Sequence, residues 1–182
     1  NNPVLEPADA QEALEFTRLA FDLSETFDTP VIVRATTRLS HTRSLVFMGP
    51  RKEAEPRSWV GDSQKTVMIP GYARIRHPQV VERIEKLTDH FSASPLNRWD
   101  RGDSGFGVIT HGTCYPYVKE VAPEASVLKL AASYPLPEKL IREFAATVER
   151  VIVVEELEPV LEVEIRSFGV DVEGKEFFPR VG

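Results

Sequence analysis

The chain has 182 residues, 42% hydrophobic and 27% charged, which is ordinary globular usage for one medium domain or one domain with part of another. A net charge of -6, without basic clusters among aromatic residues, argues against nucleic-acid binding. With a single cysteine, the chain cannot form an internal disulfide, a thiolate zinc site or an iron–sulfur cluster, and we expect a cytoplasmic location. No apolar run approaches the roughly 20 residues that span a bilayer, so no membrane association is predicted.

The first predicted element is an amphipathic helix that begins after Asp9 and ends near Asp28. Asp9 and Glu12 have the spacing of a capping box, and apolar residues then recur on one face. A short β-branched strand at 30–33 follows and is expected to be buried on both faces. One helix and one strand cannot form a core, so this unit must complete a sheet whose other strands lie later in the chain or in a longer parent protein.

Between residues 39 and 78 the periodicity is lost, and prolines and glycines interrupt a polar stretch. We predict a long crossing between domains here. A helix is predicted after Pro78, ending near residue 91, because proline is favoured in the first turn of a helix. Residues 97–104 are predicted to form a polar loop.

Strands and helices alternate in the last part of the chain. Strands are predicted at 106–110, 126–130 and 151–154, and helices at 113–121, 137–148 and 159–168. This alternation predicts an α/β fold with a three-layer, mostly parallel sheet, helices on both faces and right-handed crossovers. We expect no complete active site within residues 105–156.

Ligands of open parallel sheets bind beyond the carboxyl ends of the strands, which selects a turn containing Thr110, Gly112 and Thr113. Backbone N–H groups of this turn could receive an anion, and a simple tight turn with Thr113 as helix N-cap is the alternative. His111 is interpreted as a turn residue rather than a base. Gly105 and Gly107 precede or enter a strand, whereas a dinucleotide fingerprint needs its glycines after the strand, so that type of site is rejected.

Glu155 and Glu156 follow a very apolar strand and are candidates for a general base or for contact with a neighbouring subunit. Their side chains should point in opposite directions, so they do not easily share one substrate. The alternative is an acidic pair that is favoured by the dipole of the following helix.

The strongest site signal follows the first strand, where polar and cationic residues suit a carboxylate or phosphate group. These residues are Arg34, Arg38, Ser40, His41 and Arg43. An interdomain salt-bridge patch is the alternative interpretation. The four histidines have no metal-ligand spacing, so no metal site is predicted, and neither Ser44 nor Cys114 has a nucleophile-elbow signature.

Several segments resemble, in the same order, the alpha subunits of indolepyruvate ferredoxin oxidoreductases, members of the thiamine diphosphate-dependent 2-oxoacid ferredoxin oxidoreductase family. The most specific are the Thr-Thr-Arg-x-Ser-His segment within 34–41 and the Tyr-Pro-Leu-Pro segment at 134–137. Residues 5–13, 117–120 and 153–157 add to the resemblance.

The resemblance implies three parts. Residues 1–48 would end a pyrimidine-binding thiamine domain, 49–104 would be a linker and connecting helix, and 105–182 would be a domain similar to the C-terminal domain of transketolase. The cofactor-activating glutamate would then precede Asn1, while the metal-diphosphate motif and the cluster cysteines would follow Gly182. This segment is therefore expected to carry no cofactor, whereas the parent would use thiamine diphosphate, magnesium and 4Fe-4S clusters.

The implied reaction of the parent is the oxidative decarboxylation of aryl 2-oxoacids such as indolepyruvate to acyl-CoA, with reduction of ferredoxin. The parent would also need a beta subunit. Within this chain, the resemblance places Thr37, Arg38, Ser40 and His41 near the substrate or at a domain interface. We expect a segment that docks domains, borders the active site and is inactive alone. A stand-alone interaction or scaffold module, which would engage a partner through its acidic surface and Glu155-Glu156, is the alternative.

Overall fold

The computed structural model describes residues 2–51, 53, 58 and 60–179. Its larger sheet has four strands in the order β3-β5-β4-β7. The strands are β3 (Arg98–Asp100), β4 (Phe106–His111), β5 (Ser126–Leu130) and β7 (Arg150–Val154). The three longer strands run parallel, and β3 pairs antiparallel with β5 at the edge. The prediction of a mostly parallel α/β sheet is therefore confirmed.

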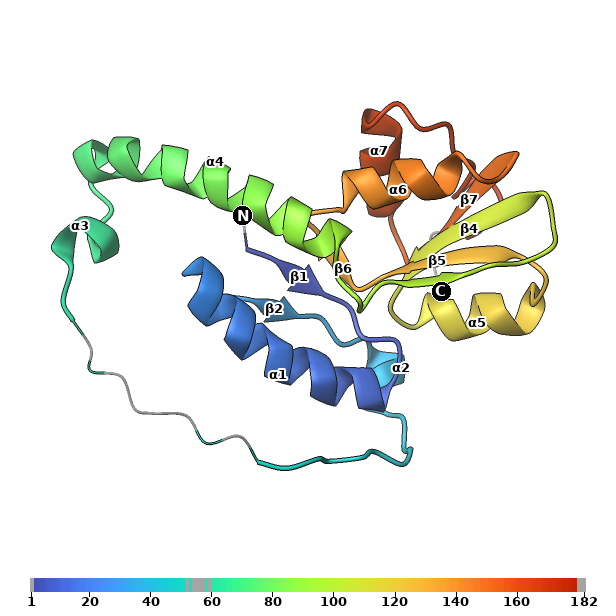
Figure 1. Cartoon of the computed structure of the whole chain (residues 1–182), viewed down its shortest axis with the longest axis horizontal. Helices are drawn as coiled ribbons and strands as arrows, with labels where there is room; N and C mark the ends of the chain where they lie inside the picture. The colour runs from blue at the N-terminus through green and yellow to red at the C-terminus, as the bar shows by residue number, and fades with distance from the viewer. Residues whose placement is uncertain (1, 52, 54–57, 59, 180–182) are drawn as a thin grey trace.

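Helices cover both faces of this sheet (Figure 1). They are α5 (Cys114–Val121) on one face, and α6 (Glu138–Ala145) with α7 (Val160–Ser167) on the other. Successive residues of β4 supply the two cores, because side chains alternate across a strand. Val108 packs with Val118 of α5, whereas Ile109 packs with Phe144 of α6 and Ile165 of α7. The three predicted layers are present.

Gly107 of β4 allows α6 to approach the sheet closely. A Cβ atom at this position would lie 2.7 Å from Cζ of Phe144, which is closer than real side chains tolerate. Close packing of helix and strand therefore explains the glycine, in agreement with the rejection of a dinucleotide fingerprint.

The smaller sheet has three strands in the order β2-β1-β6. They are β1 (Val4–Leu5), β2 (Ile32–Val33) and β6 (Ala132–Tyr134). The central strand β1 runs parallel to β2 and antiparallel to β6, so the first unit does find a partner strand later in the chain. Ile32 is 48% exposed, and the expectation that its strand is buried on both faces is wrong, because β2 lies at the edge of the described sheet.

The long helix α1 (Ala10–Phe27) packs on the smaller sheet, and Asp9 is its N-cap as predicted, although Glu12 accepts the N–H of Ala8 and not that of Asp9. The side chain of Asp9 accepts the N–H of Glu12 at 2.8 Å, and the Glu12 carboxylate accepts the N–H of Ala8 at 2.8 Å. Phe16 and Leu23 are buried in a core shared with α4 (Pro70–Ser92). Burial of this apolar face, more than intrinsic propensity, fixes the helix against the sheet.

Two predictions for the middle of the chain are wrong. Helix α4 begins at Pro70, not after Pro78, because Pro70 already occupies the first turn. Pro78 lies inside the helix on an exposed surface. Water can therefore satisfy the backbone carbonyl that loses its helical partner at this proline. The predicted loop at 97–104 contains β3, a strand too short to show a hydrophobic period.

The remaining helices are short: α2 (Thr37–Ser40) and α3 (Ser63–Thr66). No helix or strand occurs among the described residues from 42 to 62, which form an extended segment along the outside of the molecule (Figure 1). Within the described part of the chain, no helix is long and apolar enough to cross a bilayer. The domain boundaries at 48 and 105 stay a prediction, although β6 takes part in the smaller sheet from beyond the second of them.

Candidate functional site

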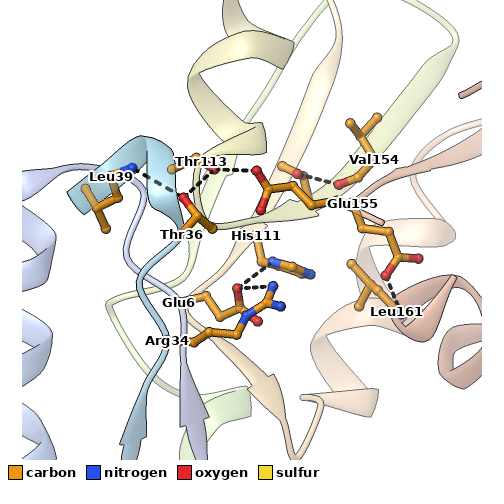
Figure 2. Close-up of polar contacts among 11 residues, drawn as sticks. Glu6, Arg34, Thr36, Leu39, His111, Thr113, Val154, Glu155 and Leu161 are labelled. Atoms are coloured by element: carbon orange, nitrogen blue, oxygen red, sulfur yellow. Dashed lines mark hydrogen bonds and ion pairs between the residues drawn. The ribbon is translucent and has the colours of Figure 1, made fainter. Parts of the chain in front are cut away.

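The carboxyl ends of two strands from different sheets meet at one place (Figure 2). Arg34 and Thr36 follow β2 of the smaller sheet, while His111 ends β4 of the larger sheet and Thr113 follows it. We call these residues, together with Glu6 and Glu156, the junction cluster. Two segments that were predicted as ligand sites because they follow strand ends, one after β2 and one after β4, therefore lie side by side.

Glu6 is the centre of one half of the junction cluster. It is 3% exposed, accepts a hydrogen bond from the Arg34 guanidinium at 2.7 Å and lies 3.2 Å from Nδ1 of His111 (Figure 2). Burial acts to raise the pKa of Glu6, but the hydrogen bond and charge of His111, with hydrogen bonds from Arg34 and Ser133, outweigh burial and lower the pKa to about 2. Glu6 is therefore a stable anion that ties β1, β2 and β4 together.

Hydroxyl groups form the other half. Thr113 Oγ1 donates to the Glu156 carboxylate at 3.2 Å and lies 3.5 Å from Thr36 Oγ1, which accepts the N–H of Leu39 at 3.3 Å. Thr113 is the N-cap residue of α5, as the tight-turn alternative expects, but its side chain makes no capping hydrogen bond because its hydroxyl donates to Glu156.

The residues predicted to approach substrate lie on or next to α2. Thr37, Arg38 and Ser40 belong to this helix, His41 is its C-cap, and all four are exposed. The Arg38 guanidinium lies 5.2 Å from the centre of the Tyr117 ring, and a hydrogen bond with Tyr117 raises the pKa of Arg38. Arg38 therefore keeps its charge in contact with solvent, on an aromatic support from α5.

The threonine side chains of the turn predicted to bind an anion are engaged in other contacts. Thr110 is fully buried and donates its hydroxyl to the Val154 carbonyl at 2.7 Å. Gly112 has a φ of 53° and closes a tight turn after β4. The Glu6 carboxylate lies 3.4 Å from where a Cβ of Gly112 would be, so a negative charge already stands beside the turn. This arrangement favours the simple turn over the anion site.

Glu155 and Glu156 engage different parts of the molecule. Glu155 is 6% exposed and accepts the N–H groups of Leu161 at 2.7 Å and Glu162 at 2.9 Å, at the start of α7. Glu155 therefore satisfies the amino end of a helix, as the dipole interpretation expects, and is not available to a partner. Glu156 points instead to the junction cluster.

A second buried polar group connects α1 with the larger sheet. Lys129 of β5 is fully buried and bonded to the Glu12 carboxylate, which also lies 3.0 Å from the Arg98 guanidinium. Burial lowers the pKa of Lys129, and the attraction of Glu12 acts against this shift. This buried ion pair fixes the position of α1 relative to β5 and β3.

Sequence reasoning missed Glu6 and Lys129. A lysine inside an otherwise apolar strand is a usable signal, because a fully buried lysine needs a partner. Glu6 gives no such signal, since its partners lie far along the chain.

The described residues contain no group of three or more His, Cys, Asp or Glu that could hold a metal ion. Burial raises the pKa of the Cys114 thiol to about 11, so the thiol is not a reactive nucleophile at neutral pH.

No family model matches the chain. It is 41% identical over 180 residues to the indolepyruvate oxidoreductase subunit IorA of Archaeoglobus fulgidus, covering 95% of this chain and 29% of that subunit. It is 38% identical over 200 residues to IorA of Pyrococcus horikoshii, covering 100% of this chain and 31% of that subunit. The chain thus spans about 30% of the length of these curated relatives.

Among solved structures, the fold is similar to a 2-oxoglutarate:ferredoxin oxidoreductase from Magnetococcus marinus, determined with 2-oxoglutarate, coenzyme A and succinyl-CoA bound. The TM-score is 0.65 at 16% identity, over 95% of this chain and 38% of that chain. The resemblance seen in the sequence is confirmed: over nearly its whole length, this chain is a relative of part of the IorA subunit of indolepyruvate oxidoreductases.

Proposed function

We propose that this chain is the part of a 2-oxoacid oxidoreductase subunit that joins two α/β units and presents α2 to the substrate. The observation that carries the proposal is the junction cluster, in which the ends of β2 and β4 meet beside α2. Similarity to IorA over 95% of the chain supplies the enzyme class.

The proposed reaction of the whole enzyme is the oxidative decarboxylation of an aryl 2-oxoacid such as indolepyruvate, with coenzyme A taking the acyl group and ferredoxin the electrons. The names of the IorA relatives, together with the name and bound ligands of the similar ferredoxin oxidoreductase, support this substrate class and these partners. Thiamine diphosphate with magnesium and 4Fe-4S clusters would supply the decarboxylation and electron transfer. We propose that other parts of the enzyme, including a beta subunit, hold these groups, and that the enzyme is cytoplasmic.

Arg38 is the residue best placed to contact the carboxylate of a 2-oxoacid. Its guanidinium is exposed, charged and supported by the Tyr117 ring, and a guanidinium can bind a carboxylate through two parallel hydrogen bonds. Thr37, Ser40 and His41 lie on the same turn and offer further polar groups. The interdomain alternative applies to Arg34 instead, because its guanidinium is bonded to Glu6.

Substitution of Arg38 by alanine in the whole oxidoreductase tests this role. We expect kcat/KM for the oxoacid to fall about 10- to 150-fold, the effect of losing a hydrogen bond to a charged group. Arg74→Ala is a matched control, because Arg74 is also exposed but belongs to α4. An unchanged kcat/KM in the Arg38 variant would exclude contact between Arg38 and the substrate.

The proposal also requires that this chain alone does not form the cofactor site. Calorimetric titration of the chain with thiamine diphosphate and magnesium should show no binding, and tight binding would contradict the proposed division of roles. The scaffold alternative is weakened because Glu155 is buried and caps α7, which leaves only Glu156 of the proposed acidic contact.

A further inference from the structure

The hydroxyl groups of the junction cluster have a fixed order of donation. The Glu156 carboxylate can only accept, so the one O–H group of Thr113 donates its hydrogen bond to Glu156. At the 3.5 Å contact between the two threonine hydroxyls, Thr36 must then be the donor. Thr36 is left as the acceptor for the Leu39 N–H in the first turn of α2. The order runs from the α2 backbone through two hydroxyls to one carboxylate.

This order makes the position of α2 depend on the other sheet. A helix of four residues has almost no stability of its own, so tertiary contacts must hold it. Thr113 is buried, and hydrogen bonds that point the same way through a buried group strengthen one another. Glu156 follows β7 and Thr113 follows β4, and neither residue belongs to the unit that carries α2.

We infer that Thr113 and Glu156 are positioning residues that hold α2, and through it Arg38, in place for the oxoacid carboxylate. The inference rests on the proposed function, because it assigns these residues a role in the binding of the same substrate. They do not touch the substrate themselves. The feature that supports the role is the oriented contact between the α2 backbone and a carboxylate on the far side of the junction.

Two substitutions at one position test the inference in the whole oxidoreductase. Thr113→Val keeps the shape of the side chain but removes the hydroxyl, whereas Thr113→Ser keeps the hydroxyl. We expect Thr113→Val to raise KM for the oxoacid about 3- to 10-fold with little change in kcat, the effect of losing the one hydrogen bond, from Thr36 to Thr113, that holds α2. Thr113→Ser should behave as the wild-type enzyme. Equal defects in both variants would overturn the inference.

A double variant separates positioning from general damage. If Thr113 acts through Arg38, adding Thr113→Val to Arg38→Ala should lower kcat/KM no further than Arg38→Ala alone. Fully additive losses of kcat/KM in the double variant would overturn the inference. If Arg38→Ala alone still lowers kcat/KM, the proposed function stands.

Hydrogen exchange gives a readout that does not depend on activity. Thr113→Val should speed exchange of the α2 amides, including Leu39, about 3- to 10-fold, with no comparable change in α7. If exchange rises but Arg38→Ala has normal kinetics, α2 is positioned as inferred and the proposed substrate contact fails. Unchanged exchange in α2 would overturn the positioning role itself.

Discussion

Removing Glu12 should destabilise this protein far more than removing other acidic residues of the same helix. Lys129 is 0% exposed, and Glu12 is the carboxylate that its ammonium group contacts. In the Glu12→Leu variant the lysine must either remain charged without that partner or lose its proton. Breaking a buried ion pair on one side costs about 3 to 5 kcal/mol.

Deprotonation of Lys129 sets an upper limit to the free-energy cost of leaving its charge without a partner. For a lysine with an ordinary pKa of about 10.4, neutralisation at pH 7 costs about 4.6 kcal/mol, at about 1.4 kcal/mol per pH unit. The pH dependence of this stability deficit gives a second expectation. If Lys129 is neutral in the folded variant, the unfolded chain binds a proton that the folded chain does not, so stability rises with pH. Between pH 7 and 9 the deficit of Glu12→Leu should shrink by about 1.4 kcal/mol per unit.

Urea unfolding followed by circular dichroism measures both quantities. Glu15→Leu is the matched control, because Glu15 is an exposed glutamate of α1, and its substitution should change the free energy of unfolding by less than about 0.5 kcal/mol. Adding Lys129→Met to Glu12→Leu should recover part of the loss, since no buried charge is then left alone. A Glu12→Leu variant within about 1 kcal/mol of the wild-type protein would refute the reasoning, whereas a large deficit that does not change with pH would show that Lys129 stays charged in the folded variant.

Two further predictions concern the sheet core and the junction cluster. Gly107→Ala should lower the free energy of unfolding by about 1 to 3 kcal/mol through the clash with Phe144, whereas Gly71→Ala, with no atom within 4 Å of the added Cβ, should be neutral or stabilising in the same urea assay. For Glu6, whose pKa is lowered to about 2, the stabilisation is present above its ordinary pKa of 4.5 and is lost as pH falls from there towards 2. The stability deficit of Glu6→Gln relative to the wild-type protein should therefore narrow over that range, and a deficit that stays constant down to pH 2 would contradict the assigned ionisation.

The larger sheet was predictable from the sequence because its parallel strands are long enough to show their pattern. The strands β4, β5 and β7 are apolar runs separated by helices with clear amphipathic faces. By contrast, β1, β3 and β6 contain two or three residues each, and a strand of that length has no measurable period. They exist because a longer strand or a neighbouring sheet edge supplies their hydrogen bonds.

The candidate site was predictable in part, and for a physical reason. Strand ends can be located in a sequence, so Arg34, Thr113 and Glu156 could each be singled out. Which strand ends meet depends on how the two sheets pack, and local pattern carries no information about that packing. Glu6 was missed for this reason, because its partners Arg34 and His111 come from both sheets.

The central place of β1 in the smaller sheet also constrains how the chain can fold. Val4 pairs with Ile32 on one side and with Tyr134 on the other, so the sheet is completed only after most of the chain has been made. Pairing over such a sequence distance closes slowly, because the entropy of a long loop must be lost first. Until then Phe16 and Leu23 of α1 lack one part of the core that buries them, Ala131 and Ala132. During synthesis, the apolar face of α1 is therefore incompletely covered until β6 has been made, and exposed apolar surface of this kind favours aggregation.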